Sequence, residues 1–349
     1  MQSRRDFVRN IITTALLSGS FSTSLLSASS QSMSGYIKPK RLKSGQTIGL
    51  IAPSSNFMEN ESIRFAADIL KSFGFRVKKG QYIFDRNGYL AGEDRDRAAD
   101  VNAMFADKEV DAIVCIRGGY GSPRILPYLD YDVIKQNPKV IIGFSDVTAL
   151  LNAIHVKTGL ITFHGPNAGR NFSDYTLSEY KKVLFDPQLT TIAAPPPFEM
   201  TEGQAERENR ITVITPGKAQ GELIGGNLSL MVKLVGTPYE PSYKNKILFL
   251  EDVSEAQYRI DGMLTHLKLA GRLDQLAGIV FGKCTRCRDE GNTLSLEQVL
   301  IDHLKPLGIP AVRGLMIGHI KDLSTTPIGV RAELDTGHNG IKLLETAVS

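Results

Sequence analysis

Tryptophan is absent from this chain of 349 residues, and only three cysteines occur, Cys115, Cys284 and Cys287. So few cysteines in so long a chain exclude a fold held together by a disulfide framework. No run of lysine and arginine alternates with aromatic residues, so no nucleic-acid partner is expected. Hydrophobic residues make up 42% and charged residues 22% of the sequence, which excludes a disordered or fibrous chain.

An uninterrupted apolar run is also missing. The apolar stretch 11–26 is broken by glycine, serine and threonine, whereas a membrane span needs about 20 mostly apolar residues. Arg4 and Arg5, followed by Phe7, precede this stretch and resemble a twin-arginine export signal. We therefore expect residues 1–34 to be a signal peptide and the mature protein to be periplasmic, without a stable membrane span. The alternatives are an N-terminal anchor that stays attached, and a cytoplasmic protein if the signal is not used.

Cys284 and Cys287 form a lone C-x-x-C pair. A zinc site would need two more ligands nearby, and a redox site would need a thioredoxin-like context. Neither is evident in the neighbouring sequence. We therefore expect a non-catalytic pair in a loop, with a metal or redox site as the alternative; export would permit oxidation of the pair, but the sequence leaves its state open.

Short apolar runs alternate with stretches of helical spacing in the first half of the chain. Strands are expected at 47–52, 75–77, 110–116 and 140–143, and helices at 59–73, 95–105 and 147–154. Several of these strands are apolar on both faces, which is typical of a parallel sheet covered by helices. The fold class predicted is α/β, with an N-terminal, mainly parallel, flavodoxin-like sheet flanked by helices.

The length favours two domains. The pattern of the first half ends near Asp186, and a proline-rich and polar stretch follows. We therefore predict a nucleophile domain at 35–185, a linker at 186–216 and a second, smaller α/β or β-rich domain at 217–349. Within the second domain, strands are expected at 247–250 and 276–281, with a helix at 260–269 between them.

Ser145 follows the apolar strand 140–143 and precedes a helical stretch. A serine on such a turn has an exposed hydroxyl beside unpaired N–H groups of the helix start, and it is placed to attack a carbonyl. The alternative is that Ser145 or Asp146 simply caps the helix.

The glycine-rich segment 117–121 also follows a strand. Its backbone N–H groups could stabilise an oxyanion, because glycine lets the main chain approach closely, or the segment could be only a tight turn. It is not a G-x-G-x-x-G fingerprint, so a nucleotide site ranks low.

A serine nucleophile needs a base, and the chain has six histidines. Three of them, His155, His266 and His303, fall at ordinary positions in helical stretches. His164 lies near Ser145 in sequence and is a real competitor. His319 is expected to end an apolar strand, as is Glu251, a carboxylate that could orient an imidazole. The residues alone leave this choice open.

Nine segments together resemble the LD-carboxypeptidase family of serine peptidases, also called murein tetrapeptide carboxypeptidases. In chain order they are IAPS at 51–54, GYLAG at 88–92, RGGYG at 117–121, GFSD at 143–146, HGP at 164–166, GGNL at 225–228, LED at 250–252, YRID at 258–261 and GH at 318–319. They cover nearly all of the expected mature chain.

The resemblance implies a Ser-His-Glu triad, with Ser145 as nucleophile, His319 as general base and Glu251 as the orienting carboxylate. It also implies an oxyanion hole formed by backbone N–H groups of Asp146 and of Gly118 or Gly119. The implied reaction releases terminal D-alanine from a murein tetrapeptide by hydrolysis of an L,D-peptide bond, without a metal or other cofactor. The family commonly forms homodimers, which the sequence neither supports nor contradicts.

Arg117 borders the expected cleft, so it is a candidate to bind the free carboxylate of the substrate, or else a structural ion-pair partner. Two other functions stay open. One keeps the fold and triad but hydrolyses a peptide-nucleotide antibiotic and confers immunity; the absence of tryptophan ranks it lower. The other is an exported peptide-binding protein in which Ser145 is only a helix cap.

Overall fold

The computed structural model describes residues 35–186, 188–288 and 291–349, so the predicted signal peptide at 1–34 lies outside the described residues. The first sheet has the strand order β12-β5-β4-β3-β1-β2. Its strands are β1 (Thr47–Ile51), β2 (Arg76–Lys79), β3 (Ala112–Cys115), β4 (Val140–Gly143), β5 (Thr162–His164) and β12 (Thr326–Ile328). Strands β1 to β5 are parallel, and β12 is antiparallel to β5.

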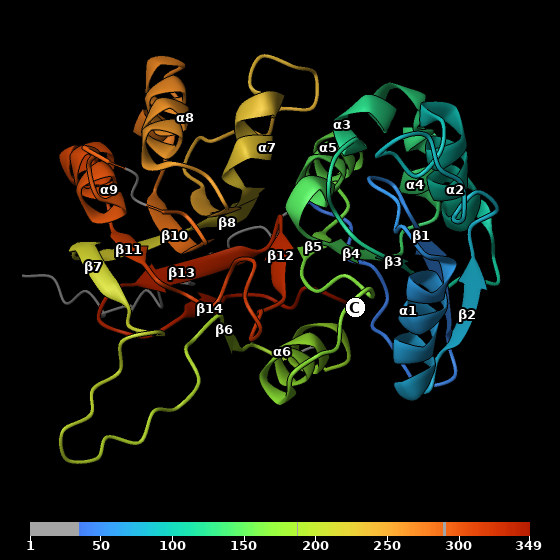
Figure 1. Cartoon of the computed structure of the whole chain (residues 1–349), viewed down its shortest axis with the longest axis horizontal. Helices are drawn as coiled ribbons and strands as arrows, with labels where there is room; N and C mark the ends of the chain where they lie inside the picture. The colour runs from blue at the N-terminus through green and yellow to red at the C-terminus, as the bar shows by residue number, and fades with distance from the viewer. Residues whose placement is uncertain (1–34, 187, 289–290) are drawn as a thin grey trace, which may run out of the picture. The chain divides into compact units, whose positions relative to one another are not determined.

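The order 2-1-3-4-5 of the parallel strands is that of a flavodoxin-like sheet, as predicted. Every residue of β1, β3 and β4 is buried, because helices flank the sheet (Figure 1). These helices are α1 (Asn60–Ser72), α2 (Asp94–Ala106), α3 (Ser122–Ile125), α4 (Tyr131–Gln136), α5 (Thr148–Thr158) and α6 (Asp174–Leu184). Short 3-10 turns, η1 (Leu126–Tyr128) and η2 (Ser145–Val147), extend α3 and precede α5.

The second sheet has the order β6-β14-β13-β8-β9-β10-β11-β7. Its strands are β6 (Thr191–Ile192), β7 (Thr212–Thr215), β8 (Lys218–Asn227), β9 (Ile247–Val253), β10 (Gly278–Thr285), β11 (Ala311–Arg313), β13 (Arg331–Asp335) and β14 (Ile341–Leu343). The central strands β8 to β11 are parallel, and the outer strands are antiparallel. The prediction that a second, β-rich domain follows the first sheet is confirmed.

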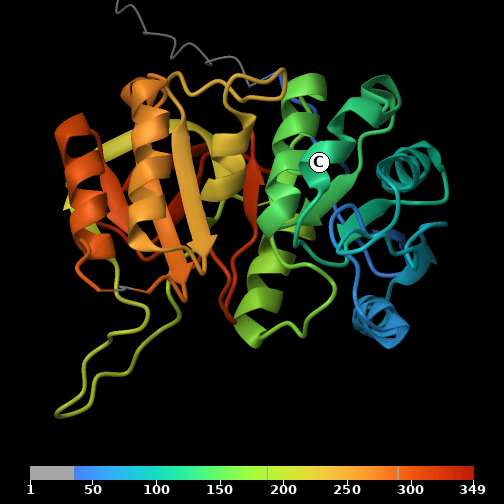
Figure 2. The ribbon, with the colours of Figure 1, turned by 45° about the horizontal axis from the view of Figure 1, so that its top comes forward.

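Three helices cover the central strands of this sheet, namely α7 (Leu228–Leu234), α8 (Gln257–Leu269) and α9 (Leu296–Leu304), together with η3 (Leu273–Gln275) and η4 (Lys305–Leu307). The orange helices α8 and α9 lie side by side (Figure 2). Their apolar side chains, such as Ile260, Leu264 and Leu300, form a second buried cluster with Leu248 and Phe281 of the sheet. This packing buries one face of β9 and β10, and both strands lead to the candidate site.

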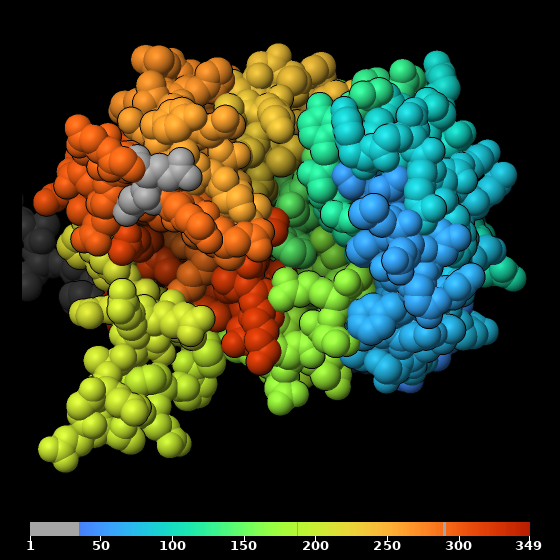
Figure 3. Space-filling model, viewed as in Figure 1, coloured from blue at the N-terminus to red at the C-terminus, as the bar shows by residue number. Residues whose placement is uncertain are grey.

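The segment predicted as a linker, 186–216, contains the two short strands β6 and β7, and both belong to the second sheet. The chain between them projects from the body as a long loop, yellow-green in Figure 3. The exact boundaries 35–185, 186–216 and 217–349 stay a prediction. Of the helices in the described residues, none combines the length and the apolar character needed to cross a bilayer.

Several contacts join the two sheets, and three of them lie close to Ser145 or to β5. Strand β12 comes late in the chain yet extends the first sheet beside β5. Asn152 of α5 donates from Nδ2 to Gly225 O at 3.0 Å, and the backbone N–H of Asn227 donates to Thr148 Oγ1 at 3.0 Å. The helix that follows Ser145 is thereby bonded to the end of β8, so groups at the carboxyl ends of both sets of parallel strands face one another.

Candidate active site

Ser145 lies at the turn between β4 and α5, as predicted. Its φ is +66°, a left-handed conformation that is strained for any residue other than glycine. The turn is tight, since a Cβ on Gly143 would come within 2.9 Å of both Asn167 Oδ1 and Val147 Cγ1. The strained turn places the hydroxyl at the cavity, where Ser145 is a lining residue.

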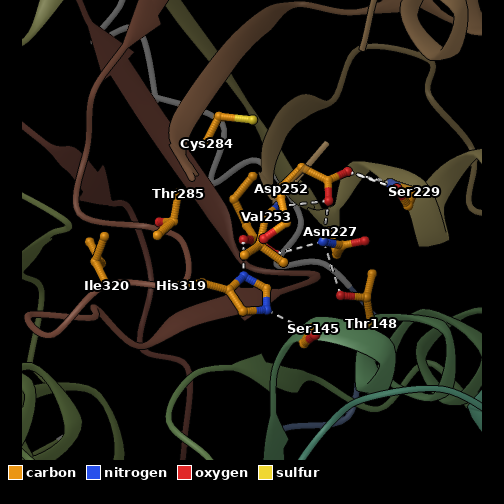
Figure 4. A network of polar contacts seen from close by, with 12 residues as sticks. Ser145, Thr148, Asn227, Ser229, Asp252, Val253, Cys284, Thr285, His319 and Ile320 are labelled. Atoms are coloured by element: carbon orange, nitrogen blue, oxygen red, sulfur yellow. Dashed lines mark hydrogen bonds and ion pairs between the residues drawn. The ribbon is translucent and has the colours of Figure 1, made fainter. Parts of the chain in front are cut away.

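The structure brings Ser145, His319 and Glu251 together, and Figure 4 shows the His319 ring directed at Ser145. His319 Nε2 lies 2.9 Å from Ser145 Oγ, and His319 Nδ1 lies 2.7 Å from Glu251 Oε2. Glu251 is fully buried. In such an arrangement the carboxylate fixes the imidazole orientation, and the imidazole can accept the hydroxyl proton.

Two local expectations about this trio were wrong. Glu251 does not end its strand: β9 continues to Val253, because β10 pairs with it again beyond a bulge, at Cys284 and Thr285. His319 does not end a strand either, since β11 stops at Arg313.

The apolar run before His319 forms a buried loop rather than a strand. Gly314 and Gly318, on either side of it, have φ values of +100° and +149°, and these values interrupt an extended ladder. The loop is instead held by single hydrogen bonds, including Lys283 N–H to Ile317 O at 2.8 Å. His319 therefore reaches the cavity from a loop that is pinned to β10.

Asn227 and Asp252 support Glu251 from behind, and the sequence had singled out neither one. Asn227 Nδ2 donates to Glu251 Oε1 and to Asp252 Oδ1, at 3.1 Å each. Burial raises the pKa of Asp252, while hydrogen bonds from Val253 N–H, Ser229 and Asn227 oppose this rise. The GGNL and LED segments already contained both residues, and membership of these segments was the available signal.

The glycine segment after β3 lies directly against Ser145. A Cβ on Gly118 would come within 2.7 Å of Ser145 Cβ and 3.1 Å of the Asp146 backbone nitrogen. A Cβ on Gly119, whose φ is +115°, would come within 2.4 Å of Ser55 Oγ. Only glycine fits at these positions, and the Asp146 N–H belongs to the first turn of the helix, where such groups lack helical acceptors. The predicted oxyanion residues are therefore gathered beside Ser145.

The Asp146 side chain points away from this chemistry. Its Oδ2 accepts from Ser122 N–H at 2.7 Å, which ties the start of α3 to the turn after β4. Asp146 thus places its backbone nitrogen beside Gly118 and Ser145, while its carboxylate stabilises the fold.

A cavity of about 530 Å³ opens over Ser145 and His319. Among its lining residues are Arg117, Arg170 and Arg286. Arg117 donates to Asn56 O at 2.8 Å and lies over the Phe57 ring. None of these three arginines makes an ion pair with a carboxylate of the described residues, which favours Arg117 as a substrate-binding group over a structural ion-pair partner.

The competing histidine, His164, is fully buried in β5 between the rings of Phe144 and Phe249. Burial, with a smaller effect of the nearby His319, lowers its pKa to about 3. Its ring nitrogens have no hydrogen-bond partner in the part of the chain that the structure describes. It is His319, and not His164, that meets Ser145.

Cys284 and Cys287 form a disulfide, and Cys115 is a buried free thiol. The pair closes a turn at the end of β10, as expected for a loop pair. Within the described ranges, no group of three or more histidine, cysteine, aspartate or glutamate side chains is arranged to hold a metal ion.

Two family models match the chain. The LD-carboxypeptidase N-terminal domain matches residues 48–165, and the LD-carboxypeptidase C-terminal domain matches residues 220–334. The chain belongs to the LD-carboxypeptidase family. It is a serine-type carboxypeptidase, as the resemblance of its motifs implied.

Its relatives include both kinds of enzyme that the motifs suggested. A probable murein peptide carboxypeptidase of Bacillus subtilis is 39% identical over 320 residues, which are 89% of this chain and 95% of the relative. The structure of the microcin C7 self-immunity protein MccF superimposes with a TM-score of 0.81 at 28% identity, over 90% of this chain and 100% of MccF. A muramoyltetrapeptide carboxypeptidase from Oxalobacter formigenes superimposes with a TM-score of 0.71 at 28% identity, over 85% of this chain and 98% of that enzyme.

Proposed function

We propose that this carboxypeptidase releases terminal D-alanine from murein tetrapeptides through a triad of Ser145, His319 and Glu251. The observation that carries the proposal is the pair of contacts made by His319, 2.9 Å to Ser145 Oγ and 2.7 Å to Glu251 Oε2. The names of the relatives that act on murein peptides support the substrate class.

In the proposed reaction, His319 accepts the Ser145 proton while Oγ attacks the carbonyl carbon that precedes D-alanine. The tetrahedral oxyanion is stabilised by backbone N–H groups of Asp146 and of Gly118 or Gly119. His319 then donates its proton to the leaving amine, D-alanine departs, and an acyl-enzyme remains on Ser145. Water, deprotonated by His319, hydrolyses this ester and restores the serine.

Arg117 is proposed to bind the terminal carboxylate of the leaving D-alanine. It directly precedes Gly118 and lines the same cavity as Ser145. The planar guanidinium suits a carboxylate, and its position beside the proposed oxyanion hole would favour cleavage of the last peptide bond.

The test is mass spectrometry of murein tetrapeptide incubated with the purified protein and with Ser145→Ala. We expect the wild type to remove one alanine residue, and the variant to bind the peptide without turning it over. Full turnover by Ser145→Ala would remove the triad from the proposal.

The likeness to MccF supports a second candidate substrate, a peptide-nucleotide conjugate. The aromatic rings of this cavity, those of Phe57 and Phe144, are each in contact with a cationic or imidazole group of the protein, and these contacts compete with the stacking of a base. We therefore place murein peptides first. Incubation of the protein with an aminoacyl sulfamoyl adenosine, followed by chromatography of the products, distinguishes the two.

We also propose that residues 1–34 export the protein to the periplasm. The Cys284–Cys287 disulfide supports this proposal, because such bonds persist in oxidising compartments. Replacing Arg4 and Arg5 with lysine should retain the protein in the cytoplasm, as measured by cell fractionation. An unchanged periplasmic fraction would exclude the twin-arginine route.

A further inference from the structure

The disulfide loop, residues 284–287, closes the end of β10 beside the catalytic cavity. The cysteines are only three positions apart, and so short a ring constrains the unfolded chain less than a long one. What the bond fixes best is therefore local geometry. Inside the ring, Arg286 has a φ of +57°, which is a strained conformation for a residue with a side chain.

The disulfide loop is attached to the strand that carries Glu251. Cys284 and Thr285 are in register with Asp252 and Val253 of β9, and Figure 4 shows Val253 close to His319 and Cys284 farther away. Ser254 N–H donates to Thr285 O at 2.8 Å, and Arg286 Nε donates to Ser254 Oγ at 3.2 Å. The Arg286 side chain is therefore held at a defined place relative to the catalytic residues.

Arg286 lines two cavities. One is the catalytic cavity, and the other is an adjoining, more polar cavity of about 380 Å³ that also includes Arg259 and Arg288. Glu255 lies in the adjoining cavity too, with Oε2 at 3.9 Å from Arg259 Nη1. Among the described residues that line this cavity, three arginines face one glutamate, so that lining is cationic.

The guanidinium of Arg286 keeps free donors at the junction. Its Nε is bonded to Ser254, while its two NH₂ groups have no acceptor among the described residues. Two parallel N–H groups on a planar fork match the two oxygens of a carboxylate.

We propose that Arg286 binds a carboxylate on the acyl part of the substrate, and that the disulfide loop holds it in place for this contact. The inference rests on the proposed function and names the substrate class more closely: peptides that carry an anionic group besides the terminal carboxylate. In this proposal the terminal carboxylate leaves with D-alanine bound to Arg117, whereas the acyl part extends past Arg286 into the adjoining cavity.

The test compares three synthetic tetrapeptides. The first has a free glutamate α-carboxylate at position two and meso-diaminopimelate at position three. The second has L-lysine in place of diaminopimelate, and the third has the glutamate carboxylate amidated. The second and third peptides each lack one of the two carboxylates that the first peptide carries on its acyl part. The L,D-peptide bond to D-alanine is present in all three.

Arg286→Gln should raise KM for the first peptide roughly tenfold, because a charged hydrogen bond is lost, with little change in kcat. The loss should disappear with either the second or the third peptide, which identifies the carboxylate bound. Arg64→Gln, a surface change on α1, is the matched control and should leave all three KM values unchanged. An equal loss on all three peptides, or a loss in kcat alone, would overturn the role of Arg286 while leaving the proposed function intact. If the wild type hydrolyses none of the peptides, the proposed function fails, and this inference fails with it.

The double variant Cys284→Ser/Cys287→Ser tests the disulfide loop. It should raise KM for the first peptide as Arg286→Gln does, with an unfolding temperature close to that of the wild type. In the Arg286→Gln background it should add no further loss, since both changes remove the same contact. Additive losses, or a fully retained KM in the double variant, would contradict the part assigned to the disulfide loop.

Discussion

The Asn227 amide donates to two adjacent carboxylates at once, Glu251 Oε1 and Asp252 Oδ1, each at 3.1 Å. This contact occupies one oxygen of Glu251 and leaves the other, Oε2, to His319. It also offsets the repulsion between two buried acidic side chains. This geometry favours a positioning role for Asn227, which would act on the proposed triad through Glu251.

Asn227→Asp tests this relationship. The change keeps the side-chain oxygen that caps α7 through Leu230 N–H, but it removes the donor and adds a third carboxylate. We expect kcat/KM to fall by roughly 10- to 100-fold at neutral pH, the cost of a hydrogen bond to a charged group. Because like charges raise carboxylate pKa values, the acidic limb of the pH–rate profile should move to higher pH. A limb that stays in place would show that Asn227 does not act through Glu251.

Gly118→Ala should abolish most activity without unfolding the protein. The new Cβ would press on Ser145 Cβ and the Asp146 nitrogen, which would displace the proposed nucleophile and a proposed oxyanion donor. Loss of one such donor costs about 100-fold or more in kcat.

The matched control for that change is Gly262→Ala. Gly262 lies in α8 with open space where a Cβ would be placed. We expect full activity and a gain of about 0.5–1 kcal/mol in the free energy of unfolding, because alanine favours helix more than glycine does. Equal activity in both variants, measured on the same peptide, would exclude a tight fit at Gly118.

His164 should make the protein sensitive to acid. Its pKa is about 3 in the folded protein and about 6.5 when exposed. The unfolded chain therefore binds a proton that the folded protein does not, and stability present above pH 6.5 is lost as the pH falls toward 3. Because of this group, the free energy of unfolding should fall by up to about 1.4 kcal/mol for each pH unit in that range.

The variant His164→Leu should flatten this dependence in urea denaturation series between pH 7 and pH 5. At pH 7 the variant should be about as stable as the wild type, since the ring nitrogens have no partner among the described residues. An unchanged slope would mean that other groups carry the acid response.

Thr148→Val should weaken the junction between the two sheets. The buried N–H of Asn227 would lose its acceptor, at a cost of about 1–3 kcal/mol. Thr148→Ser keeps the hydroxyl and is the control, so only the valine variant should lower the urea midpoint and kcat together. If both variants behave alike, the hydrogen bond is not what joins the sheets.

The regular elements around Ser145 could be predicted from sequence because their signals are local. The apolar run 140–143 predicted a buried strand, and the observed β4 has the same bounds with every residue buried. The turn at Ser145 follows directly from that strand. The predicted helices 59–73 and 95–105 likewise correspond to α1 and α2 within a residue or two.

What could not be predicted depends on contacts between distant segments. Leu315–Ile317 is as apolar as a strand, but the positive φ values of Gly314 and Gly318 make it a loop. Physical reasoning on residues alone left His164 and His319 as equal candidates, and the motif resemblance favoured His319. The role of Asn227 depends on a pairing of β8 with β9 that no local pattern reveals.

Strand β12 lies after His319 in the chain but completes the sheet that carries Ser145, with Thr326 opposite His164. An edge strand of the N-terminal sheet therefore comes from the C-terminal half of the chain. A chimera built by swapping halves between two relatives would also swap that edge, so a compatible hybrid must take β5 and β12 from the same parent.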